Sequence, residues 1–491
     1  MERNCSAAEQ VRVARGLFNS LRRRQIDRRE FLLLAAGLST GALVGGLAGE
    51  ARGQGAARTV PFYTNQSDPV SAAFLTSVIS TFQKDHPGVQ VSLNFYDDST
   101  APQFLSTAFQ AGHDVGIFTP PPSFVPTWVA SGYFLPLDDI VRAIGADDFL
   151  PGTRVVAGGH DYAIPYQSNA TGLWYRKDLF DLAKIPAPLK TYNDLIGALQ
   201  ELNGKNGVIG IATGVGTTNP DVALHALTPY VEQGGWGYFS PDGKLTFNHP
   251  EVLEGVKRFV RVLNYTAKSM YNSGYSDWVT AYVSGRAAMC HFPGRVGNTI
   301  AAQNPKLADL TGFMPEPGGP FMTGRINFGS ARGFSIYAKT AYPEEAKAFL
   351  QTLATGNTGL AWSLTLPGQV LPPLKSLQKQ LLNPSNPLVA ANAYMQKHRD
   401  WILTMVDLVS TQANEESAMG TVFNKRLKVL ANPNPFGNQI WKEPAVDAIM
   451  VQHIMLEGWA PEKAWQEAST AMDNISKAFF QQNPNWKPPA A

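Results

Sequence analysis

The residues that most often carry chemistry are scattered through this sequence rather than gathered into motifs. The eight histidines never fall three to five positions apart, and Cys290 has only His291 beside it. Protein metal sites are built from closely spaced histidine, cysteine and carboxylate ligands, and iron–sulfur cofactors need clustered cysteines. We therefore expect neither a metal site nor a cofactor.

Two short segments resemble catalytic or nucleotide-binding motifs but lack the context that such motifs need. Gly37-Leu38-Ser39-Thr40-Gly41 fits the nucleophile-elbow pattern, yet it lies in an apolar leader where no strand-turn-helix unit can form. Gly214-Val215-Gly216 lacks the third glycine of a dinucleotide fingerprint, and the sequence holds no Walker loop. We expect no catalytic residues here.

Carboxylates keep one enzymatic alternative open. A glycosidase needs two carboxyl groups about 5 to 9.5 Å apart, one of them with a raised pKa. The candidates by residue type are Asp97, Asp98, Asp221, Asp277 and Glu316. No spacing singles out a pair, so a glycoside-active enzyme stays an alternative to a binding protein.

Charge is divided unevenly along the 491 residues. The first 57 residues hold nine arginines and five acidic residues, a net charge of +4. Subtracting these from the totals of 41 basic and 39 acidic residues leaves 32 and 34, a net charge of −2 for the rest. This slightly negative net charge excludes a polycationic protein that binds nucleic acid.

The basic leader has the features of an export signal. Arg28-Arg29 stand before Phe31-Leu32 and a Gly/Ala-rich apolar stretch, an arrangement that resembles a twin-arginine signal. A retained membrane anchor is the alternative, which the interrupting glycines disfavour. We expect residues 1–57 to be removed after export by the twin-arginine machinery, which leaves a diffusible periplasmic protein whose single thiol is Cys290.

The chain after residue 57 alternates between strand and helix patterns. Strand-like runs cover 59–63, 89–95 and 115–118, and apolar residues recur at helical spacing in 68–82 and 103–111. This β-α-β-α-β order is typical of an α/β lobe with a largely parallel sheet.

Several segments, in this order and spacing, resemble the extracellular solute-binding proteins of ABC transporters, the sugar-binding family that includes the maltose-binding protein. The clearest is His86-Pro87-Gly88, set between an expected helix and an expected strand. The other matching segments are 113–115, 130–139, 160–166, 173–180, 190–195, 283–289, 345–350 and 456–464. The chain departs from the family at Arg176, where an asparagine is usual, and over 375–438, which matches only loosely.

The resemblance implies an α/β, two-lobed periplasmic-binding-protein-like fold (type II), with mixed, mostly parallel sheets and hinge strands between the lobes. The N-terminal lobe would comprise 58–165 and 328–368, and the C-terminal lobe 168–320 and 370–491. The expected crossings between lobes are 164–167, 321–329 and 367–372. A ligand that touches both lobes would favour the closed form.

Ligands of α/β sheets bind beyond the carboxyl ends of the strands, so the loops after the expected strands are candidate binding segments. Their residues are neutral and rich in hydrogen-bonding groups, which suits a hydroxylated ligand better than an ion. They are Asn65, Gln66, Phe118, Thr119, Gln167, Ser168 and Asn169. Ordinary solvated loops are the alternative.

A sugar cleft also needs flat aromatic walls, because sugars present apolar C–H faces. Trp236, Trp278 and Trp441 stand in polar or glycine-rich contexts. The resemblance places His291 and Phe292 at a strand end where the family often has a tryptophan. We expect core packing instead for Trp128, Trp174, Trp362 and Trp465.

Arg332 is the one charged residue in a loop where the family tends to have small residues. It could hold a carboxylate or phosphate through two hydrogen bonds, or it could pair with an acidic residue of the other lobe. The first alternative would favour an acidic sugar or a polyol phosphate as ligand.

We therefore expect a monomeric periplasmic binding component of an ABC importer that captures a carbohydrate by hinge closure. Its partners would be the transmembrane permease subunits, with no nucleic acid; a chemoreceptor is a further alternative. Besides the glycoside-active enzyme, the alternatives for its ligand are a polyol phosphate, an acidic sugar or a polyamine.

Overall fold

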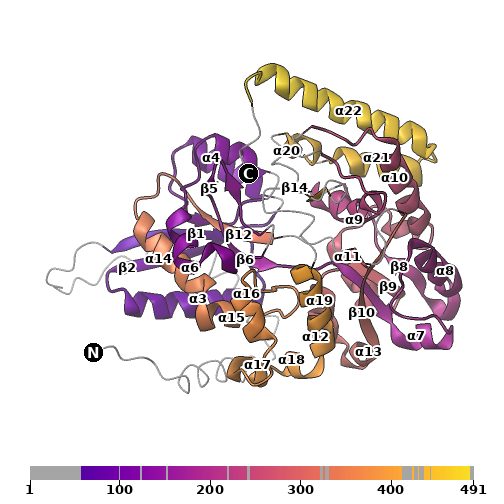
Figure 1. Cartoon of the computed structure of the whole chain (residues 1–491), viewed down its shortest axis with the longest axis horizontal. Coiled ribbons are helices and arrows are strands. Elements are labelled where there is room, and N and C mark those ends of the chain that lie inside the picture. Colours follow the sequence, from indigo (N-terminus) through magenta and orange to yellow (C-terminus); the bar gives the residue numbers. More distant parts are fainter. Residues whose placement is uncertain are drawn as a thin grey trace, which may run out of the picture.

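The computed structural model describes residues 57–98, 100–121, 124–150, 153–217, 220–239, 244–320, 325–326, 331–411, 423–424, 429–430, 436–442 and 444–486. Residues 1–56, which are all but the last residue of the expected leader, lie outside these ranges. Two lobes, each built around a sheet, lie side by side (Figure 1). In the described ranges no helix is both long and apolar enough to cross a membrane.

The first lobe is built on a five-stranded sheet with the order β2-β1-β3-β12-β6. Its strands are β1 (Arg58–Thr64), β2 (Val89–Phe95), β3 (Ile117–Phe118), β6 (Ile164–Ser168) and β12 (Ala331–Ile336). Val60, Phe62 and Thr64 are buried at alternate positions of β1, the period of a strand that packs on one side. The predicted β-α-β-α-β order is confirmed, with α3 and α4 between these strands.

Helices cover the first sheet, and their aromatic residues fill its core. Phe62 of β1 packs edge-on against Phe334 of β12 and Phe349 of α14, with ring centroids 5.2 and 5.7 Å apart. The helices associated with this lobe are α3 (Pro69–Asp85), α4 (Ala101–Gln110), α5 (Val125–Ala130), α6 (Asp138–Ile144), α14 (Pro343–Ala354), α15 (Gly356–Ser363) and α16 (Lys375–Leu381).

The second lobe is built on a sheet with the order β11-β10-β7-β9-β8. Its strands are β7 (Gly172–Arg176), β8 (Ile209–Ala212), β9 (Ala287–Phe292), β10 (Thr311–Pro317) and β11 (Arg325–Ile326). Every residue of β9 is buried, because strands flank it on both sides and helices cover both faces.

The helices of the second part of the chain lie around this sheet, with α22 outermost, against α21 and α10 (Figure 1). They are α7 (Lys177–Leu182), α8 (Tyr192–Leu202), α9 (Pro220–Glu232), α10 (Pro250–Leu263), α11 (Tyr275–Val283), α12 (Arg295–Gln303), α13 (Pro305–Asp309), α17 (Pro387–Ala391), α18 (Ala393–Lys397), α19 (Arg399–Thr411), α20 (Gly437–Ile440), α21 (Val446–Met455) and α22 (Pro461–Gln482). Two small hairpins join β4 (Val156–Ala157) to β5 (His160–Asp161) and β13 (Phe423–Asn424) to β14 (Val429–Leu430).

The expected mostly parallel pairing is wrong, although the sheets are mixed as predicted. β1 pairs in parallel with β2 and β3, and β8 pairs in parallel with β9. The other pairs in both sheets are antiparallel. In the first sheet, β12 returns from the second lobe and runs against β3 and β6. In the second sheet, β7 runs against both β9 and β10, and β11 runs against β10, which precedes it in the chain.

The chain passes from the first sheet to the second between β6 and β7, through residues 169–171, which are buried. It returns between β11 and β12, and the expected crossing 321–329 lies outside the described residues except for 325–326. A later segment of the chain runs alongside the end of β6. Its Leu371 exchanges backbone hydrogen bonds of 2.8 and 3.0 Å with Ser168. Gly294 touches the same segment so closely that a Cβ there would lie 2.1 Å from the carbonyl carbon of Gly368.

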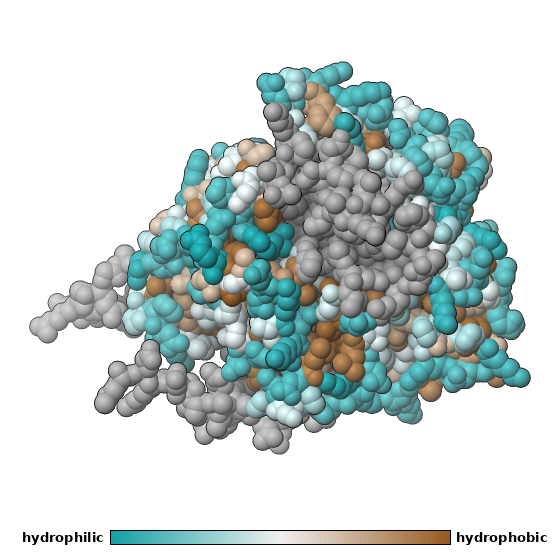
Figure 2. All heavy atoms as spheres, in the orientation of Figure 1, coloured by the Kyte–Doolittle hydropathy of each residue, from teal (hydrophilic) through white to brown (hydrophobic). Residues whose placement is uncertain are grey.

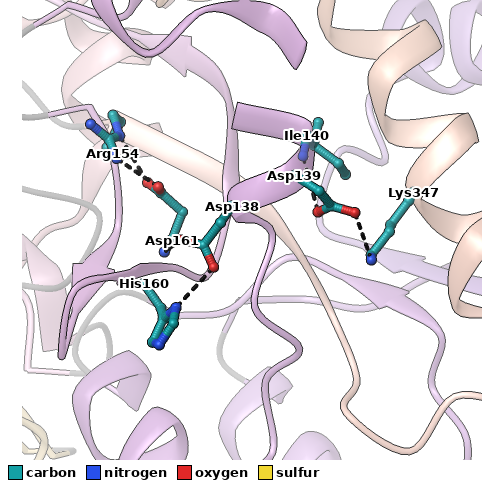
Figure 3. Close-up of polar contacts among 7 residues, drawn as sticks. All are labelled: Asp138, Asp139, Ile140, Arg154, His160, Asp161 and Lys347. Atoms are coloured by element: carbon teal, nitrogen blue, oxygen red, sulfur yellow. Dashed lines mark hydrogen bonds and ion pairs between the residues drawn. The ribbon is translucent and has the colours of Figure 1, made fainter. Parts of the chain in front are cut away.

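Ion pairs join the β4–β5 hairpin to α6, and α6 to α14 (Figure 3). Arg154 binds both carboxylate oxygens of Asp161 at 2.8 and 2.6 Å, and Lys347 of α14 donates to Asp139 at 2.8 Å. Burial alone would raise the pKa of Asp138, but hydrogen bonds from His160 and the Asp161 amide outweigh it and hold that pKa below its usual value. The network fixes the start of α6 within the lobe.

On the face drawn in Figure 2, the described residues are mostly hydrophilic. The exposed large hydrophobic residues that the described ranges contain are Phe95, Leu182, Leu310, Leu403 and Leu456. Single exposed residues of this kind are normal for a folded protein and need no partner to explain them.

Candidate functional site

The first lobe presents a polar cluster where β1 and β6 end. The Gln66 amide donates to the Asn65 side-chain oxygen at 2.9 Å and to the Tyr166 hydroxyl at 3.0 Å. Asn65 in turn donates to Asp98 at 2.7 Å. Burial raises the pKa of Tyr166, and the nearby positive charge of Arg332 partly opposes that rise. Tyr166 therefore stays a neutral hydroxyl.

Phe118 and Thr119 follow the same sheet edge but serve the lobe itself. Phe118 packs in the core, with its ring centroid 5.3 Å from Phe109 and 5.0 Å from Phe134. Thr119 donates to the Thr64 hydroxyl at 3.0 Å, and its carbonyl accepts from the Tyr96 hydroxyl. The backbone of Thr119 thus shapes the edge beneath Asn65 and Gln66.

The connection between the lobes carries the next polar residues. Gln167, Ser168 and Asn169 are all buried, and so is Thr171 just beyond them. The Thr171 hydroxyl lies 3.1 Å from Nε2 of His225 on α9. This contact places the interlobe connection directly against the second lobe.

The second lobe contributes an aromatic group at the end of β9. The ring centroid of His225 lies 5.7 Å from His291, 6.3 Å from Phe292 and 5.6 Å from Tyr275. Tyr275 also packs against Phe292 at 5.3 Å. On the other side of His291, Nδ1 lies 2.6 Å from a carboxylate oxygen of Glu316. We call His225, Tyr275, His291, Phe292 and Glu316 the second-lobe cluster.

Arg332 lies between the two groups. It pairs with Gln167 across β12 and β6, and its charge acts on Tyr166 of the first lobe and on His225 of the second. Burial lowers the pKa of His225 well below its usual value, and His291 and Arg332 lower it further. His225 is therefore a neutral ring at pH 7, able to donate one hydrogen bond and accept another.

Trp278 and Cys290 stand behind the second-lobe cluster. Trp278 is fully buried, donates from its indole to the Ser273 hydroxyl at 2.9 Å, and packs against Tyr275 at 5.3 Å and Phe292 at 6.2 Å. Burial raises the pKa of the Cys290 thiol, which therefore stays protonated. Both side chains support the cluster from within the lobe.

Trp236 and Trp441 lie elsewhere in the second lobe. Trp236 stacks on His249 with ring centroids 3.5 Å apart. Trp441 is buried against Tyr238 and Phe239, and its indole donates to Asp447 at 3.3 Å. These ring contacts do not join either tryptophan to the second-lobe cluster, so their role toward a ligand stays a prediction. Trp128, Trp174 and Trp362 are core residues, as expected.

Asp447 makes the stability of this region depend on pH. Burial raises its pKa to about 6, against hydrogen bonds from Tyr238, Trp441 and the Ala448 amide that lower it. The folded state thus holds this proton more tightly than the unfolded chain, whose aspartates titrate near about 3.9. The resulting penalty is absent below that value, grows as pH rises to about 6, and is constant above it.

We expect the thermal midpoint of the wild type to rise relative to that of Asp447→Asn when pH falls from 7.5 to 5. A relief of about 1 kcal/mol corresponds to roughly 1–2 °C, because the unfolding entropy is about 2.1 cal/mol/K per residue. Scanning calorimetry of both proteins at the two pH values measures the difference. If the thermal midpoints of the two proteins differ by the same amount at both pH values, the prediction is contradicted.

Five residues of the site were not among the predicted ligand residues: Tyr166, Thr171, His225, Tyr275 and Glu316. Glu316 was considered only as a glycosidase carboxylate. A signal for Glu316 was available, because it is the only charged residue in the otherwise uncharged run of β10. The others gave no local signal, because contacts between distant elements bring them together.

The carboxylates considered for glycoside cleavage have other partners. Asp277 accepts from the Gly274 amide at 3.0 Å and caps α11, and Asp98 binds Asn65. Asp221 has no described side chain. Among the described residues, no three histidine, cysteine, aspartate or glutamate side chains gather as a metal ion would require.

A family model for bacterial extracellular solute-binding proteins matches residues 66–355 of this chain. The chain belongs to that family. This confirms the resemblance found in the sequence. The mannitol-binding protein of Pseudomonas aeruginosa is 24% identical over 277 residues, which cover 54% of this chain and 61% of that protein. A binding protein of Brucella abortus is 26% identical over 282 residues, 55% of this chain and 62% of its own. The chain thus spans about three fifths of the length of these curated relatives.

Solved structures show the same fold. An ABC transporter solute-binding protein from Thermotoga lettingae, bound with α-D-tagatose, superposes with a TM-score of 0.67 at 19% identity, covering 85% of this chain and 100% of that one. One from Agrobacterium vitis with bound D-mannitol gives 0.67 at 20% identity, covering 86% and 99%. The predicted two-lobed periplasmic-binding-protein-like fold is confirmed.

Proposed function

We propose that this protein is the periplasmic solute-binding component of an ABC importer, and that it captures a small sugar or sugar alcohol between its lobes. One observation carries the proposal: uncharged hydrogen-bonding groups from both lobes meet around Arg332. Tyr166 and Gln66 come from one side, and Thr171 and His225 from the other. Such groups match the donors and acceptors of a polyol, and Phe292 and Tyr275 supply flat apolar surface.

Closure of the lobes is the proposed mechanism. A ligand that bonds to groups of both lobes stabilises the closed arrangement by its differential affinity for it. The permease would then recognise the closed form. In this mechanism no bond of the ligand is made or broken. We therefore propose the family's solute-binding role, and not glycoside hydrolysis.

Charge favours a neutral ligand over an anion. Arg332 is accompanied by Asp98, whose charge also acts on Tyr166, and the second-lobe cluster contains Glu316. These carboxylates offset the guanidinium, so a phosphate or carboxylate would meet repulsion as well as attraction. Arg332 is then suited to donate hydrogen bonds to hydroxyl groups. The mannitol-binding relative and the solved structures with bound tagatose and mannitol have ligands of this neutral class.

Binding is tested by thermal shift and calorimetric titration of the chain from residue 58. We expect D-mannitol, ribitol or D-tagatose to raise the thermal midpoint, because a ligand present at 100 times its Kd stabilises the folded state by about 2.7 kcal/mol. Putrescine, mannitol 1-phosphate and glucuronate serve as comparison ligands. Stabilisation by these alone, or by no member of the panel, would refute the proposal.

Export and partners complete the proposal. The basic leader with its paired arginines supports delivery to the periplasm by the twin-arginine machinery, and the membrane subunits of the importer are the proposed partners. We propose a monomer. Fractionation of cells that express the full chain, with Arg28 and Arg29 replaced by lysine as the control, tests the export route.

A further inference from the structure

His291 and Glu316 form a buried pair at the edge of the proposed cleft. Nδ1 of His291 lies 2.6 Å from a carboxylate oxygen of Glu316, and the two side chains are only 2% and 1% exposed. They stand near the ends of β9 and β10, on either side of β7. A buried carboxylate requires such a partner, because desolvation of an unpaired charge is costly.

The other ring nitrogen of His291 has no such partner. Nε2 is buried and has no hydrogen-bond partner among the described residues. A buried polar atom left without a bond costs about 1–3 kcal/mol. The His291 ring lies 5.7 Å from that of His225, which contacts Thr171, so His291 borders the groups proposed to meet the ligand.

We propose that Glu316 is a positioning residue that holds the hydrogen of His291 on Nδ1, so that Nε2 accepts a hydrogen bond from a hydroxyl of the bound polyol. The inference rests on the proposed function and assigns one of its ligand contacts. A carboxylate can only accept, so Nδ1 donates, and a neutral imidazole then has its lone pair on Nε2.

Other titratable and charged groups lie around the pair. The titratable and charged groups near the pair are His225 on α9, Cys290 on β9, Tyr230 on α9 and, beyond His225, Arg332 on β12.

The tautomer is tested without any ligand by nitrogen NMR of the histidine-labelled chain from residue 58. We expect Nε2 of His291 to have the shift of an unprotonated imidazole nitrogen in the wild type. Glu316→Gln should keep that state, because its amide oxygen can still accept from Nδ1. Glu316→Met should move the hydrogen to Nε2. A protonated Nε2 in the wild type overturns the inference, whether or not the variants fold.

The ligand contact is tested by titration with D-mannitol. We expect Glu316→Met to weaken binding about tenfold, the effect of losing one hydrogen bond, and Glu316→Gln to stay within about threefold of the wild type. Equal affinities of Glu316→Met and wild type overturn the contact. A wild type that binds no polyol refutes the proposed function and the ligand contact with it, while the NMR result still decides whether Glu316 positions His291.

Discussion

Arg332→Met should weaken binding of D-mannitol about a hundredfold. Arg332 lies where both lobes meet, since its charge acts on Tyr166 and on His225. Hydrogen bonds from a charged donor contribute about 1.5–3 kcal/mol each, and about 2.7 kcal/mol is a hundredfold in Kd. Methionine keeps most of the side-chain length but donates nothing. Isothermal titration measures the change.

The control is Arg142→Met, which removes an exposed arginine from α6 of the same lobe. It should bind with wild-type affinity. Arg332→Lys keeps the charge but not the planar fork of donors, so it should fall between the two. If Arg332→Met binds D-mannitol as well as the wild type does, Arg332 does not contact the ligand.

Trp174→Ala should destabilise the second lobe by about 3–5 kcal/mol, the cost of removing a fully buried large aromatic side chain. Trp174 packs against Phe313 and Trp401, with ring centroids 4.9 and 5.0 Å away. Its indole also donates to the backbone carbonyls of Phe292 and Pro293, at 2.9 and 3.1 Å. Urea unfolding followed by circular dichroism measures the loss.

Trp486→Ala is the matched control, because Trp486 packs only near the end of α22, against Phe479 and Phe480. It should cost far less than Trp174→Ala, and equal losses would contradict the packing argument. Trp174→Phe separates the packing role of the indole from its hydrogen-bonding role. The phenylalanine ring fills most of the space but cannot donate to the strand end that carries Phe292. We expect it to fold and to bind mannitol more weakly.

The order of elements in the first lobe could be predicted because each element there has its own local signal. The predicted run 89–95 coincides with β2, and 59–63 falls one residue short of β1 at each end. Strand direction has no such signal. The antiparallel placement of β12 depends on the route of the chain through the other lobe, which no local pattern records.

The same limit applies to the candidate site. Asn65 and Gln66 were predictable, because polar residues after a strand mark a sheet edge whatever lies opposite. His225 and Glu316 were not, since they reach His291 from elements far away in the sequence. Trp441 was predicted as a cleft wall from its polar or glycine-rich context, and its contacts with Tyr238 and Asp447 likewise had no local signal.

Cys290 makes the protein suited to site-specific labelling. It is the single cysteine after residue 57, and a thiol that is buried and protonated reacts slowly with maleimides, because the thiolate is the nucleophile. A cysteine introduced at exposed Ser67, next to Gln66, would therefore take up an environment-sensitive dye alone. Fluorescence from that position would turn lobe closure into an optical signal, and the chain into a sensor for its own ligand.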